Sequence, residues 1–148
     1  MATENEYDRR KDPRYPVPFP DHFHAGLLQL GEVRPDNEYT GDPNRPGPQK
    51  RDPVTGQPVW KISVTDPGES NPRRASFEVF LLSDTEPVPP SEEIRPGVRW
   101  IELTGMTISP RIAGQGEYKY LSRTIRATGY AQPPTSPRSS GSSGQKSA

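Results

Sequence analysis

Apolar and polar residues alternate along several short segments of this chain, with the period of two that is typical of half-buried β-strands. In "PVWKISVTD", Trp60, Ile62 and Val64 alternate with polar side chains. In "ASFEVFLL", Phe77, Val79 and Leu81 share a face. Both segments are therefore predicted to be strands with one face in a core.

Three further segments also favour strands: "GLLQLGEV", "VRWIELTGMTISPRI" and "EYKYLSRTIRATGYA". Gly105 interrupts the second of these, which predicts a bulge or sharp bend there. No segment has a sustained helical period, and "PSEEIRPG" has room for one helical turn at most. The pattern predicts an all-β protein, a small five-stranded antiparallel barrel similar to the oligonucleotide-binding (OB) fold, with a small sandwich as the alternative.

The connections carry turn residues. "DPVTG", Asp52 to Gly56, supplies the fixed and the positive φ values of a turn immediately before the Trp60 strand. "GQGEY" is predicted to be a hairpin turn between the last two strands rather than a phosphate-binding loop.

The two ends differ from the middle in composition. Residues 1–22 are polar and rich in proline, and residues 132–148 are almost entirely serine, glycine, proline and charged side chains. Such segments have too little apolar surface to offset the entropy of ordering. We expect a disordered N-terminal arm at 1–22, a β-barrel domain at 23–131 and a disordered tail at 132–148.

Charge and cysteine content restrict the classes of function and of metal site that the chain can have. The 148 residues carry 19 basic and 19 acidic side chains and no cysteine. A balanced charge gives no general argument for nucleic-acid binding, and the absence of thiols excludes disulfides and thiolate metal sites. With no apolar run of membrane-spanning length and no signal-peptide core, we expect a cytoplasmic protein that does not enter membranes.

Catalytic and metal-binding patterns are weak. Asp21, His22 and His24 lie close together, but without a second ligand cluster they are better explained as loop residues. Glu92 and Glu93 are better explained as solvated side chains than as an acid–base pair. We expect no enzyme activity, no cofactor and no metal.

The predicted hairpin formed by the fourth and fifth strands carries tyrosines between basic residues, a combination suited to single-stranded nucleic acid. Rings stack on bases and cations neutralise phosphates. By contrast, Trp60 and Trp100 both lie in strand alternation and are predicted to be core residues. The candidate nucleic-acid-binding residues are Arg111, Tyr118, Lys119, Tyr120, Arg123 and Arg126.

Four motifs in order resemble those of a known family. They are "RDPVTGQPVWKISVTD", "EPVPP", "ELTGMTISPRI" and "IRATGY". The series, covering roughly residues 15 to 131, resembles the plasmid replication, integration and excision activators of actinobacterial mobile elements. The resemblance implies a non-enzymatic accessory regulator of such an element, with its replication or recombination proteins as partners. The loop 34–50 and the longer last strand depart from the family pattern.

Two functions remain open at this point. One is a regulator that contacts DNA, preferably single-stranded, through the last hairpin. The other is a protein-interaction adaptor without DNA contact, using the proline-rich arm and the acidic connection at 84–93.

Overall fold

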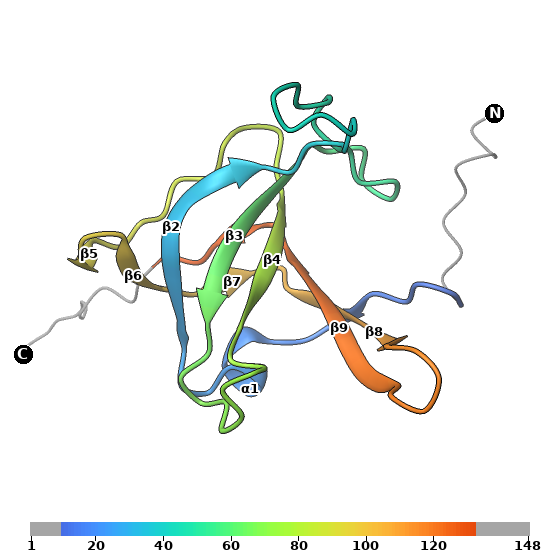
Figure 1. Ribbon diagram of the computed structural model, residues 1–148. Coiled ribbons are helices and arrows are strands. Elements are labelled where there is room, and N and C mark those ends of the chain that lie inside the picture. Colours follow the sequence, from blue (N-terminus) through green and yellow to red (C-terminus); the bar gives the residue numbers. More distant parts are fainter. Residues whose placement is uncertain (1–9, 133–148) are drawn as a thin grey trace, which may run out of the picture.

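The computed structural model describes residues 10–132, and β-strands dominate it (Figure 1). The all-β class predicted from the sequence is confirmed. The elements, in chain order, are β1 (Tyr15–Pro16), α1 (Phe19–His22), β2 (Leu27–Pro35), β3 (Val59–Thr65), β4 (Ser76–Leu82), β5 (Glu93–Arg95), β6 (Val98–Ile101), β7 (Leu103–Thr104), β8 (Thr107–Ala113), β9 (Tyr120–Ala127) and β10 (Gly129–Tyr130).

Eight of the strands form one sheet in the order β1-β8-β9-β4-β3-β2-β6-β5, and β7 pairs separately with β10. The central strands β2, β3 and β4 form an antiparallel meander. β9 joins β4 in parallel over only two residue pairs, Phe80 with Arg126 and Leu81 with Ala127. Because the sheet does not close, the five-stranded closed barrel is not supported by the pairing.

The predicted fourth strand explains much of this difference. Instead of one strand it forms β6, β7 and β8, which pair with β2, β10 and β9 respectively. The bend predicted at Gly105 lies between β7 and β8, where its φ is +62°. A Cβ atom there would lie 2.5 Å from Oγ1 of Thr128, so the close approach of the two chains also requires glycine.

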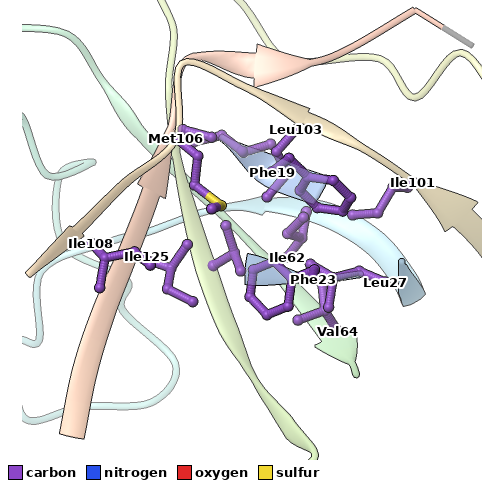
Figure 2. Close-up of a cluster of buried hydrophobic side chains, with 13 residues drawn as sticks. Phe19, Phe23, Leu27, Ile62, Val64, Ile101, Leu103, Met106, Ile108 and Ile125 are labelled. Carbon is purple, nitrogen blue, oxygen red and sulfur yellow. The ribbon is translucent and has the colours of Figure 1, made fainter. Parts of the chain in front are cut away.

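One face of the sheet covers the core, and α1 closes it. Phe19 and Phe23, at the two ends of α1, insert their rings among aliphatic side chains of the sheet (Figure 2). Ile62 of β3 is fully buried there, as predicted from the alternation. On β2 the core side is that of Leu27 and Gln29, and the buried Gln29 amide oxygen accepts a 2.6 Å hydrogen bond from the Tyr130 hydroxyl. Burial raises the pKa of that hydroxyl above its ordinary value, although the hydrogen bond opposes the shift.

The N-terminal arm is more structured than its composition predicts. Within 10–22, β1 pairs with β8 and Phe19 belongs to the core. Arg14 makes an ion pair of 2.7 Å with Asp52, and both side chains are almost inaccessible to solvent. The order comes from long-range contacts that no local composition rule includes. Residues 1–9 and 133–148 lie outside the described residues, so the rest of the predicted arm and tail stays a prediction.

The turn from Asp52 to Gly56 forms as predicted. The Asp52 carboxylate accepts hydrogen bonds from the backbone N–H groups of Val54 and Thr55, and Gly56 has a φ of +75°. Burial alone would raise the pKa of Asp52, but the hydrogen bonds from Arg14 and Thr55 and the charge of Arg14 outweigh it and hold this pKa below its ordinary value.

Two local predictions are corrected. The "PSEEIRPG" segment contains the strand β5, which pairs with β6, instead of a helical turn. Trp60 packs against the core as expected, but Trp100 lies on the opposite face of the sheet and is 44% exposed. The only described helix, α1, has four residues. No helix within residues 10–132 has the length and apolar character needed to cross a membrane.

Candidate nucleic-acid interface

β4 and β9 separate beyond their two parallel pairs and leave a cleft of about 280 Å³ between them. We call this the basic cleft. It combines three arginines with two hydroxyl side chains and the rings of Phe77 and Tyr120. Its lining residues are Arg73, Arg74, Ser76, Phe77, Tyr120, Leu121, Ser122 and Arg123.

The loop between β3 and β4 holds two of these arginines at the edge of the cleft. The Asn71 side chain accepts a 3.0 Å hydrogen bond from the Arg73 backbone N–H, and the Arg74 N–H donates to the Asn71 carbonyl at 2.9 Å. At its base the loop is closed by a 2.7 Å bond from the Asp66 N–H to the Ala75 carbonyl. The backbone that carries the arginines is thus fixed while their side chains remain exposed.

The third arginine comes from β9 and is held by packing. The guanidinium carbon of Arg123 lies 5.0 Å from the centre of the Phe77 ring, a favourable cation–π distance. Phe77 in turn stacks on Phe23, with ring centres 5.9 Å apart. The buried Nε atom of Arg123 has no hydrogen-bond partner among the described residues. Aromatic contacts that reach the core therefore set the position of this cation.

The cleft keeps its positive charge. Within residues 10–132, Arg73, Arg74 and Arg123 form no ion pair with a carboxylate. The charge of Arg123 also acts on a neighbouring group: burial lowers the pKa of His22, and the positive charge of Arg123 lowers it further, although Asp66 opposes the shift. Three cations without a carboxylate partner in the described part of the chain, beside two serine hydroxyls, make a site suited to anionic oxygens.

The hairpin of β8 and β9 extends from the cleft and carries exposed apolar side chains. Leu121, in the wall of the cleft, is opposite Ile112 in the register, and both are largely exposed. Tyr120 is also exposed at the start of β9. An exposed ring next to cations supplies a surface on which a base stacks.

The structure divides the six predicted binding residues. Tyr120 and Arg123 line the basic cleft, as a shared site requires. Arg126 does not: three residues beyond Arg123 on the same strand, it points to the other face, donates to the Ser109 hydroxyl and forms an ion pair with Asp12.

The other three predicted residues lie away from the cleft lining. Tyr118 and Lys119 are exposed in the turn that follows β8, and Arg111 is exposed on β8. The turn forms where "GQGEY" predicted it, because Gly114 has a φ of +88° and a Cβ there would overlap the Tyr118 carbonyl.

Sequence reasoning missed Arg73 and Arg74. The available signal was the pair of adjacent arginines in "NPRRAS", directly before a predicted strand. The pair becomes meaningful only through the parallel contact of β4 with β9, which joins segments about fifty residues apart.

Neither a metal site nor a known relative adds to this description. No three histidine or carboxylate side chains within residues 10–132 gather as metal ligands would. No family model matches the chain, and no curated protein or solved structure is detectably similar to it.

Proposed function

We propose that this protein is a non-enzymatic regulator that binds single-stranded nucleic acid, preferably DNA, in the basic cleft. The observation that carries the proposal is the convergence of Arg73, Arg74 and Arg123, without carboxylate partners among the described residues, on one recess beside Tyr120. Cations neutralise phosphates, and an adjacent exposed ring stacks on a base.

The form of the site favours a single strand over a duplex. The cleft lies between two strands of a sheet. Among the described residues, no helix is long enough to fill a major groove. A flexible single strand can place one phosphate in a recess and turn its base onto Tyr120, whereas paired bases are not free to do so.

The regulatory part of the proposal comes from the family resemblance of the sequence. Accessory control of replication, integration and excision of a mobile element suits a small protein that holds exposed single strands. An OB-like barrel is the architecture we propose for this role. Two features support it. β4 and β9 pair in parallel, and the continuous segment from β6 to β8 pairs with β2 at one end and with β9 at the other.

Fluorescence anisotropy tests the proposal directly. A labelled oligonucleotide of about twelve thymidines, within the range of site sizes of small single-strand binders, is titrated with the full chain. If three phosphates are neutralised, raising the salt from ~50 to ~200 mM weakens binding by about 20-fold. A duplex of the same length is the comparison and should bind more weakly.

A matched pair of variants locates the site. Arg123→Ala should weaken binding, whereas Arg95→Ala, which removes an exposed arginine on β5 at the other flank of the sheet, should not. Absence of binding at ~50 mM salt, where phosphate contacts are strong, would overturn the proposal. Equal loss in both variants would show attraction without a defined site.

A further inference from the structure

A second hollow, of about 260 Å³, lies on the other flank of the sheet, beside β6. We call it the Trp100 hollow. The six-membered ring of Trp100 lies against Gly26, where a Cβ atom would approach it to 3.3 Å. Pro90, Ser91 and Ala131 complete most of the wall, which is mainly apolar.

The wall is held in place by hydrogen bonds. The Ser91 hydroxyl donates to the Trp100 carbonyl, and the Ser91 carbonyl accepts a bond from the Arg99 guanidinium. On the other side the Ala131 N–H donates to the Glu102 carbonyl at 2.9 Å. The hollow is therefore a preformed feature of the fold.

Trp100 is not part of the hydrophobic core, and its exposed ring does not contribute to core packing. The other tryptophan, Trp60, packs on the core and donates its indole N–H to the Ser83 carbonyl at 2.9 Å. Trp100 instead presents its ring beside an open apolar hollow, and no described hydrogen bond engages its indole N–H. A large aromatic ring at the edge of a pocket is typical of the anchor positions of protein interfaces.

Carboxylates outnumber arginines in the segment that supplies most of the wall of the hollow. The segment 84–102, which supplies Pro90, Ser91 and Trp100, carries five carboxylates and two arginines. One of those arginines, Arg99, is paired with Glu93. Glu102 lies in the wall itself and is exposed. An exposed carboxylate in an apolar wall attracts basic side chains and repels phosphates.

From the apolar wall and the acidic surroundings, we propose that the Trp100 hollow docks a partner protein through a short basic segment with one apolar anchor residue. The anchor packs on Trp100 and Pro90, and lysines or arginines beside it face Glu102 and the acidic segment. The site does not depend on the basic cleft, because β3 and its neighbours separate the two. One chain can thus hold a nucleic acid and a protein at the same time.

Peptide display provides the test. A random library of peptides of about twelve residues is selected on the full chain and counter-selected on Trp100→Ala. We expect enriched peptides to be positively charged around a single Leu, Ile, Pro or aromatic residue. A synthetic copy is then titrated while tryptophan fluorescence is followed in a Trp60→Phe background, so that Trp100 alone reports.

Two variants and one control decide the outcome. Trp100→Ala removes the fluorescent reporter, so its binding is measured by the anisotropy of a labelled copy of the peptide. It should be at least about tenfold weaker, as for an interface anchor. Glu102→Gln, which keeps the shape of the side chain, should weaken it several-fold and reduce its salt dependence. Arg73→Ala should leave peptide binding unchanged.

Each contrary result is informative. No enrichment over the Trp100→Ala variant, or enrichment of acidic peptides, would overturn the proposal. The oligonucleotide could instead quench Trp100 fluorescence and lose its binding in Trp100→Ala. That result would show that the hollow binds nucleic acid and not a protein. Oligonucleotide binding that survives in Trp100→Ala leaves the function of the basic cleft intact whichever way the peptide experiment ends.

Discussion

The basic cleft and the Trp100 hollow differ in how each is built. The strands that form the cleft, β4 and β9, and the strand beside the hollow, β6, lie on either side of β3 and β2 in the sheet (Figure 1). The cleft exists because two strands pair briefly and then separate, and its cations remain without carboxylate partners within the described residues. The hollow exists because the connection between β4 and β5 is hydrogen-bonded to β6 through Ser91 and Trp100. Its wall includes the exposed carboxylate of Glu102. A neutral net charge is therefore compatible with a cluster of cations at one place and an exposed carboxylate at another, each suited to a different kind of partner.

The largest effect is expected from the core that supports the cleft. Phe23→Ala should lower the free energy of unfolding by about 3–5 kcal/mol, because the buried ring leaves a cavity under Phe77 and Arg123. Urea denaturation measures this loss. A loss under about 1 kcal/mol would show that the site collapses easily and that the ring does not hold Arg123 in place.

A second variant weakens the fold without touching either surface. Asp52→Ala removes an ion-pair partner of the almost buried Arg14 and should cost about 3 kcal/mol. In the parent protein the pKa of Asp52 is depressed, so its contribution is complete above an ordinary pKa of about 4 and is lost as the pH falls through the folded-state pKa. Denaturation between neutral and acidic pH should show that decline in the parent and a smaller one in the variant. At neutral pH, where both chains are folded, oligonucleotide and peptide binding should be unaffected.

The two tryptophans provide the sharpest structural contrast. Trp60→Ala should destabilise the protein by about 3 kcal/mol, because the ring packs on the core and its N–H bonds Ser83. Trp100→Ala should cost only about 1 kcal/mol, since much of its ring is exposed. Equal losses by chemical denaturation would mean that Trp100 is a structural residue and not a docking surface.

Arginine substitutions separate the cleft from the rest of the hairpin. Replacing both Arg73 and Arg74 by alanine should lower the slope of log affinity against log salt by about 1.4, since each neutralised phosphate of a single strand contributes about 0.7. Arg111→Ala, on β8 outside the cleft lining, should leave the slope unchanged. Anisotropy titrations at several salt concentrations measure both. A lower slope in Arg111→Ala, with an unchanged slope in the double variant, would place the nucleic-acid site on the β8–β9 hairpin instead of in the basic cleft.

The smallest effect concerns the tyrosines. Tyr120→Ala should weaken oligonucleotide binding by about 1 kcal/mol through the loss of one stacking surface. Tyr118→Ala, in the turn outside the cleft, is the matched control and should bind as the parent does. Equal effects in the two variants would indicate general aromatic contact instead of a defined base position.

Local chemistry accounts for the parts of the structure that the sequence predicted well. The alternation around Ile62 identifies a strand and its buried face, because side chains of a strand alternate between its faces. Asp52 and Gly56 identify a turn, and Gly105 a bend, because few residue types tolerate these backbone angles.

Features that depend on contacts between distant segments could not be read in this way. The ordering of residues 10–22 rests on Phe19 in the core and on the pair of Arg14 with Asp52. The exposure of Trp100 depends on which face of β6 meets the core, and alternation alone gives the two faces without saying which is covered.

The sequence by itself determined the all-β class, the strand segments of β2, β3, β4 and β9, the turn before β3 and the presence of tyrosines and arginines near the C-terminal end of the domain. Only the tertiary structure decided that Arg123 packs on Phe77 and that Arg73 and Arg74 join Tyr120 at one cleft. The physical reason is that composition and period are properties of short segments. A binding site, in contrast, is a meeting of segments whose pairing and register are set by the burial of the whole core.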